Sequence, residues 1–172
     1  MRDRSFTKRY LRAPDSQGAG ELTSSNRYSV VFFSTSVARA TKLAALLSVA
    51  AIRVHQASSW SEVRILLQIT SAGVVLLDGK TIGPCGELLR ELSADFPDVC
   101  TAVLSPFDVE SAAQLYAEGA WEVVGEPARL IDLLAALESA HDLHEELTDP
   151  VRLQVRVHAV MMEFVKRREL TA

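Results

Sequence analysis

Five short apolar runs, separated by segments with helical periodicity, constrain the fold of this chain more than any other feature. The runs are SVVFFSTS (29–36), IRVHQAS (52–58), GVVLLD (73–78), CTAVLS (100–105) and WEVV (121–124). Each run is continuously apolar and does not alternate with polar residues, which is typical of strands buried on both faces of a parallel sheet. Alternating strands and helices therefore predict an α/β fold with a doubly wound, five-stranded parallel sheet and right-handed crossovers.

Helix-capping residues mark the segments between the runs. Ser59 and Glu62 form a capping-box pair that opens a helix through residue 69. Asp108 is placed to cap the next-to-last helix, and Gly119 to end it. Pro127 is predicted to start a last long helix.

Charge divides the chain into three parts. Residues 1–30 hold six basic and three acidic side chains, residues 28–149 hold seven and seventeen, and residues 150–172 hold five and two. We interpret residues 1–27 as a basic, disordered arm and linker, with a nucleic-acid or membrane contact as the competing interpretation. The acidic middle, residues 28–147, is predicted to be the domain, and its charge argues against a nucleic-acid surface.

Several polar residues stand where the predicted strands end. They are Ser34, Thr35, Asp78, Ser105, Glu126 and Pro127. In an open parallel sheet the carboxyl ends of the strands form the edge where ligands bind. Asp78, which closes the most apolar of the runs, therefore lies where a site is expected.

These landmarks, taken in order, resemble the receiver domain of bacterial response regulators, over about residues 29–142. Asp78 falls on the family's phosphoacceptor aspartate, and Gly86 follows eight residues later. Ser105 falls on the hydroxyl that senses the phosphoryl group, and YAEGAWEVVGEP (116–127) matches the family's last strand. The resemblance implies a flavodoxin-like sheet of order 2-1-3-4-5 and a cis bond between Glu126 and Pro127.

The chain departs from the family where phosphoryl chemistry is performed. Two acidic residues that hold Mg²⁺ in the family are here Ser34 and Thr35, and neutral hydroxyls are poor ligands for that ion. The family's lysine is here Glu126, an anion where a cation would stabilise developing negative charge. A second carboxylate near Asp78 is also expected to raise the pKa of one of the pair.

Asp78 therefore has three interpretations. It is a structural or vestigial residue, an unusual acceptor with Glu126 as a substitute metal ligand, or part of a site for another small anion or ligand. We favour a degenerate receiver (a pseudo-receiver) that signals by protein contact, is not an enzyme, and needs no metal or cofactor. The alternative is a true phosphoacceptor of a two-component phosphorelay, with Asp78 as acceptor and Mg²⁺ as cofactor.

The C-terminal part, residues 148–172, is predicted to form an amphipathic helix beyond the domain, begun by Pro150. Its apolar stripe includes Leu153, Val157, Val160, Met161 and Phe164. A strand is the competing interpretation for its first residues, because VRLQVRV alternates with period two. The stripe is expected to be covered by a second subunit in a homodimer, by a signalling partner, or by the domain itself.

The remaining candidates are predicted to be structural. Cys85 and Cys100 are predicted to be buried thiols of a protein in the reducing cytoplasm. No apolar run is long enough to cross a membrane. His141, His144 and Glu145 have a spacing that can hold a metal, but their polar surroundings favour a solvated helix face.

Overall fold

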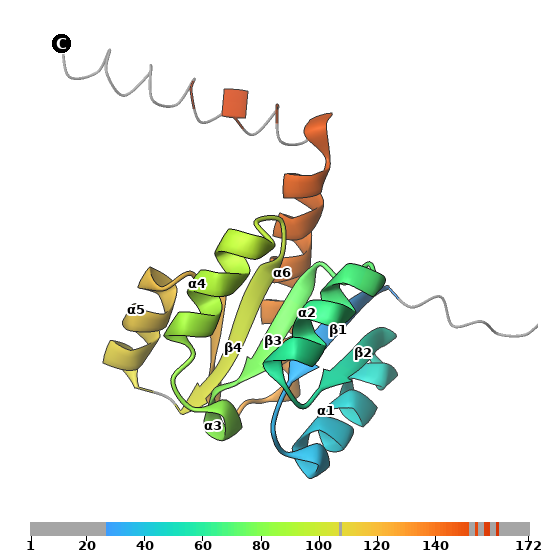
Figure 1. The fold of residues 1–172 in the computed structure, drawn as a ribbon, viewed down its shortest axis with the longest axis vertical. Coiled ribbons are helices and arrows are strands. Elements are labelled where there is room, and N and C mark those ends of the chain that lie inside the picture. The colour runs from blue at the N-terminus through green and yellow to red at the C-terminus, as the bar shows by residue number, and fades with distance from the viewer. Residues whose placement is uncertain (1–26, 107, 152–153, 155–156, 159–160, 162–172) are drawn as a thin grey trace, which may run out of the picture.

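The computed structural model describes residues 27–106, 108–151, 154, 157, 158 and 161. The strands are β1 (Tyr28–Phe33), β2 (Ile52–Ala57), β3 (Val74–Asp78), β4 (Cys100–Pro106) and β5 (Glu122–Glu126). The helices are α1 (Val37–Val49), α2 (Trp60–Ile69), α3 (Gly79–Ile82), α4 (Gly86–Asp95), α5 (Val109–Ala117) and α6 (Leu130–Thr148). A strand is followed by one or more helices throughout the described domain (Figure 1).

The five strands form one parallel sheet in the order β2-β1-β3-β4-β5. This confirms the predicted flavodoxin-like arrangement. Because the chain moves outward from β1 in both directions, the strand order reverses between β1 and β3. The carboxyl ends of those two strands are the position at which such sheets bind ligands.

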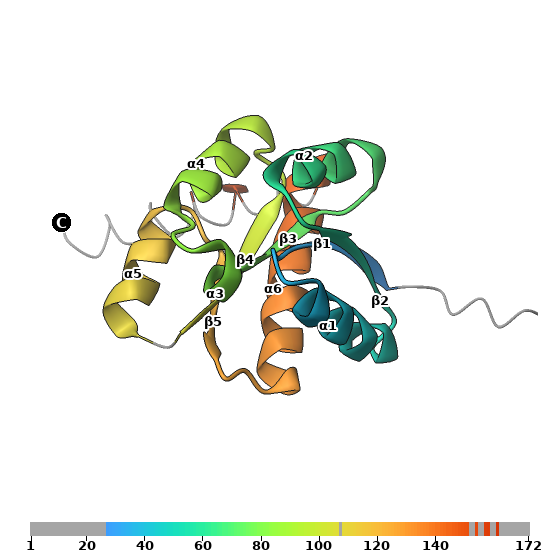
Figure 2. The same cartoon turned by 60° about the horizontal axis from the view of Figure 1, so that its bottom comes forward.

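Helices cover both faces of the sheet, and alternate residues of β1 show how the core is divided. Val30 and Phe32 pack with α1 and α6 on one face, whereas Val31 and Phe33 pack with α2, α4 and α5 on the other. All five residues of β3 are buried. Figure 2, turned to bring the carboxyl edge forward, shows α1 and α6 on one side of the sheet and α2 and α4 on the other.

Two local features differ from the sequence prediction, whereas two predicted helix caps are confirmed. The four-residue helix α3, directly after Asp78, is not among the elements predicted from the sequence. The last helix begins at Leu130, not at Pro127, because Pro127 belongs to a turn with a cis peptide bond. Ser59 and Asp108 cap α2 and α5 as predicted.

From Pro150 on, the described residues beyond α6 are helical and exposed. They are Pro150, Val151, Gln154, Val157, His158 and Met161. This supports the additional C-terminal helix over the competing strand. Of the predicted apolar stripe, Leu153, Val160 and Phe164 lie outside the described residues. No helix in the described part of the chain is both long and apolar enough to cross a membrane.

The histidines of α6 pack against the domain, so the predicted solvated face is wrong for them. His141 stacks on Tyr28 with ring centroids 4.2 Å apart. His144 donates through Nδ1 to the Asp98 carbonyl oxygen at 2.6 Å and lies against Gly73. Together these contacts fix the second half of α6 at the amino-terminal end of the sheet.

We predict that Gly73→Ala lowers the free energy of unfolding by about 1–3 kcal/mol, the usual cost of overpacking. A Cβ at Gly73 would lie 1.9 Å from Cδ2 of His144, whose ring is held by the Asp98 carbonyl. Urea denaturation measures the change. In a His144→Ala background the added methyl group has room, and the same substitution should cost less than about 0.5 kcal/mol. Equal costs in both backgrounds would contradict this packing.

Candidate functional site

The carboxyl edge of the sheet gathers most of the polar residues that the sequence singled out. Asp78 is the last residue of β3 and its side chain is fully buried. Ser34 directly follows β1 and is also buried. Glu126 ends β5, two strands away from β3. Two carboxylates therefore face the same region, as the topology predicted.

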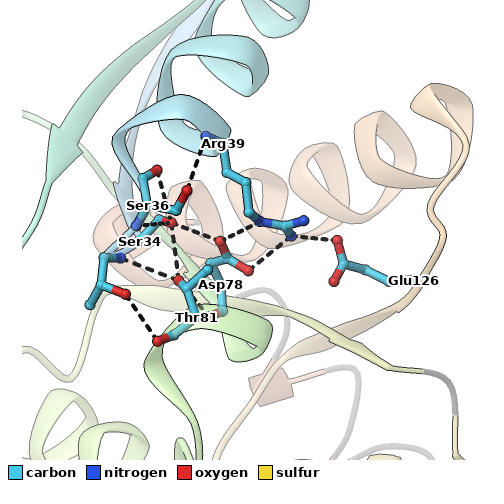
Figure 3. A network of polar contacts seen from close by, with 7 residues as sticks. Ser34, Ser36, Arg39, Asp78, Thr81 and Glu126 are labelled. Atoms are coloured by element: carbon cyan, nitrogen blue, oxygen red, sulfur yellow. Dashed lines mark hydrogen bonds and ion pairs between the residues drawn. The ribbon is translucent and has the colours of Figure 1, made fainter.

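Arg39, in the first turn of α1, supplies the cation that these carboxylates require. Ser36 caps the helix by accepting a hydrogen bond from the Arg39 backbone N–H, which begins α1 at this edge. The Arg39 side chain then donates to both oxygens of Asp78, from Nε to Oδ2 at 2.8 Å and from Nη2 to Oδ1 at 3.0 Å. Figure 3 shows this two-point contact, the strongest form of an arginine–carboxylate pair.

The same guanidinium also reaches Glu126. Arg39 Nη2 donates to Glu126 Oε1 at 2.5 Å, so one cation lies between the two carboxylates (Figure 3). Arg39 is one-third exposed, whereas Glu126 is mostly buried. Glu126 Oε2 is closed off from solvent, and no residue that the structure describes donates a hydrogen bond to it.

Hydroxyl groups complete the surroundings of Asp78. Ser34 Oγ donates to Asp78 Oδ2 at 2.7 Å and lies 3.1 Å from Thr81 Oγ1 on α3. Thr35 contacts Thr81 twice, through its backbone N–H and through its hydroxyl, which donates to the Thr81 carbonyl oxygen at 3.0 Å. The unpredicted helix α3 thus closes the site over Asp78 and ties it to the end of β1.

The pKa of Asp78 is set by burial on one side and by its hydrogen-bond donors on the other. Burial by itself raises the pKa of this carboxyl, but the hydrogen bonds from Arg39 and Ser34 and the Arg39 charge outweigh it, and the pKa is lowered. The hydrogen bonds to Asp78 and Glu126 raise the pKa of Arg39. The sequence predicted a raised pKa for one of the two carboxylates, and Asp78 is not that one, because the Arg39 cation stands between them.

Ser105 and Pro127 lie farther from this network. Ser105 Oγ donates to the Pro106 carbonyl oxygen at 3.4 Å and lines a separate cavity between α4 and α5. Pro127 follows Glu126 through a cis peptide bond, which confirms the prediction for this corner. Neither side chain takes part in the Arg39 contacts.

Sequence reasoning missed Arg39, the residue that organises the site. A signal was present, since two carboxylates at one buried edge require a nearby cation. The stretch 28–149 holds only seven basic residues, and Arg39 is the first of them after β1. Arg39 lies in the first turn of the helix that begins at the carboxyl edge of the sheet, so it was the basic residue best placed to pair with these carboxylates.

The residues present do not fit Mg²⁺. Asp78 is the one carboxylate beside Ser34 and Thr35, and Arg39 already engages both of its oxygens. Among the described residues there is no group of three acidic, histidine or cysteine side chains placed to hold a metal ion. A divalent cation at Asp78 would have to replace a guanidinium that is covalently part of the chain.

Comparison with known proteins supports the receiver fold. No protein-family model matches the chain, and no curated protein sequence matches it. A crystal structure of a response regulator receiver domain protein from Clostridium thermocellum superposes with a TM-score of 0.63 and 25% identity, over 70% of this chain and 99% of that one.

Two further structures show the same fold at lower identity. The beryllofluoride-activated NtrC4 receiver domain dimer matches with a TM-score of 0.59 and 18% identity, over 67% of this chain and 98% of that one. An adenylate cyclase from Rhodopirellula baltica matches with a TM-score of 0.64 and 17% identity, over 73% of this chain and 96% of that one. Receiver domains recur among the neighbours, which supports a signalling receiver module.

We predict that Arg39→Met lowers the free energy of unfolding by about 2–3 kcal/mol, because it leaves the buried Asp78 carboxylate without a cation, with Ser34 as its remaining hydrogen-bond donor. The estimate lies below the usual cost for a fully buried pair, since Arg39 is one-third exposed. Arg64→Met is the matched control, because it breaks an exposed pair with Asp95 and should cost less than about 1 kcal/mol. Chemical denaturation of both variants measures the difference, and equal losses would contradict the role given to Arg39.

Proposed function

We propose that this protein is a degenerate receiver that signals through protein contact, without phosphorylation of its strand-end aspartate. The observation that carries the proposal is the two-point contact of Arg39 with Asp78. Both oxygens of the carboxylate accept hydrogen bonds from this guanidinium, and the carboxylate is fully buried.

The chemistry of acyl phosphate formation explains why this contact matters. One carboxylate oxygen must attack phosphorus, and a metal and a cation must neutralise the charge that develops on the phosphoryl oxygens. Here Asp78 offers no unpaired oxygen and Ser34 and Thr35 are poor metal ligands. Glu126 adds negative charge, while Arg39 is already shared between two carboxylates.

We predict that acetyl phosphate with Mg²⁺ produces no phosphoaspartate at Asp78, and that beryllofluoride does not bind. Each opposed charge removes on the order of a few kcal/mol of transition-state stabilisation, so the reaction should be slower by several orders of magnitude. Intact-protein mass spectrometry and ¹⁹F NMR measure the two outcomes.

A rebuilt site provides the control for this prediction. Ser34→Asp, Thr35→Asp and Glu126→Lys restore the family's residues, and Arg39→Ala removes the guanidinium that blocks the carboxylate. The four changes together should allow phosphorylation that is lost when Asp78→Asn is added, whereas Arg39→Ala alone should not. Stable phosphorylation of the unmodified protein, lost in Asp78→Asn, would instead establish the alternative of a true phosphoacceptor.

We propose that the C-terminal helix supplies the contact surface and forms a homodimer in the cytoplasm. The two described residues of its predicted stripe support this, because Val157 and Met161 are both more than half exposed. Apolar side chains repeated on one helix face are a common basis of association. That one structural neighbour is a receiver domain dimer is consistent with the proposal.

We predict that the full chain is a dimer by light scattering, and that Val157→Glu with Met161→Glu yields a monomer. Buried apolar area would drive the association, so two charges on the stripe should oppose it. Ala159→Glu, which helical spacing places on the opposite side of the predicted helix from the stripe, is the control and should leave the dimer intact. A monomeric full chain would favour packing of the stripe on its own domain.

A further inference from the structure

A cavity of about 280 Å³ lies between α1 and α6, beside the Arg39 ion pair. Its buried wall is apolar and includes Phe32 from β1 and Leu104 from β4. Leu46 and Leu130 line it from the two helices and are each about 40% exposed, which places them at the mouth. The volume is near the lower end of the range for small-molecule sites, roughly 300–1,000 Å³.

Positive charge is concentrated on the α1 side of this cavity. Arg39 and Lys42 both line it and are three positions apart on α1, so they share one face of the helix. The side chain of Lys42 forms no hydrogen bond or ion pair with any other residue in the described part of the chain. Asp78 and Glu126 engage Nε and Nη2 of Arg39 and leave Nη1, with its two N–H donors, without an acceptor among the described residues.

The orientation of Arg39 directs these unused donors away from Asp78. In Figure 3 the third guanidinium nitrogen carries no dashed line and lies on the side opposite the Asp78 carboxylate. A planar guanidinium that already holds a carboxylate through one edge can bind a second anion through another. Apolar walls beside two unused cationic donors match a ligand with an apolar body and one anionic group.

We propose that this cavity binds a small organic acid, with its carboxylate on Arg39 Nη1 and Lys42 and its apolar body against the leucines of α1, β4 and α6. The site uses the nitrogen that the ion pair leaves free, so a ligand can bind there while Arg39 still holds Asp78 and Glu126. It is therefore separate from the function proposed above, and either can fail without the other.

The test uses the ¹⁵N-labelled full chain, with octanoate and its neutral isostere octanamide as probes. Octanoate should shift the backbone amides of Leu46 and Leu130 in a saturable way. Octanamide should bind at least about tenfold more weakly, the scale of a lost charge-assisted hydrogen bond. Arg39 is left intact, because changing it would also disturb Asp78.

Lys42→Gln and Lys80→Gln form a matched pair of variants, since both remove one lysine charge and only Lys42 lines the cavity. Lys42→Gln should weaken octanoate binding about tenfold and leave octanamide binding unchanged, because one charge-assisted contact is lost. Lys80→Gln should change neither. The proposal is overturned if octanoate does not bind saturably, if the shifts lie elsewhere, if acid and amide bind equally, or if the two variants behave alike.

Discussion

The Arg39 guanidinium, held between two carboxylates, is the interaction on which the carboxyl edge of the sheet depends. A buried ionised carboxylate is tolerated only when it is paired and hydrogen-bonded, and Asp78 is fully buried. Arg39 and Ser34 together satisfy it. Because Arg39 also holds Glu126, one side chain joins α1 to β3 and β5. Asp78 is 39 positions and Glu126 is 87 positions from Arg39 along the chain.

The fold was predictable because its signals are local. The strands are continuously apolar, and the caps at Ser59 and Asp108 mark helices regardless of what packs around them. The placement of Asp78 and Glu126 at one edge also followed, since the topology of a parallel sheet brings its strand ends together. The short helix α3 and the start of α6 were missed, because a single turn and a cis-proline corner leave little trace in hydrophobic periodicity.

Only part of the site was predictable. The residue that was missed, Arg39, turns an expected repulsion between Asp78 and Glu126 into a joint contact with one cation. From sequence, Glu126 is an anion facing another anion, and repulsion follows. Helix periodicity places Arg39 on a face of α1 but does not show that its side chain reaches β5 as well as β3. With the guanidinium between them, the two carboxylates are joined, and the pKa of Asp78 is lowered. The charge of a strand-end residue can therefore be interpreted only together with the charged residues in the first turns of the helices that begin at the same edge of the sheet.

A guanidinium differs from a metal ion as a counterion in one respect that matters for signalling. A bound metal exchanges with solvent and accepts a phosphoryl group as an additional ligand, whereas Arg39 is part of the chain and already contacts two carboxylates. The charge at this edge is therefore fixed by the sequence. If the protein signals as proposed, a signal enters through another surface, and the cavity between α1 and α6 shares Arg39 and Glu126 with the site. Since the guanidinium is planar and rigid, a contact at Nη1 that moved it would also move the nitrogens held by Asp78 and Glu126. Occupancy of the cavity would then be transmitted to β3 and β5, the strands whose ends these carboxylates close.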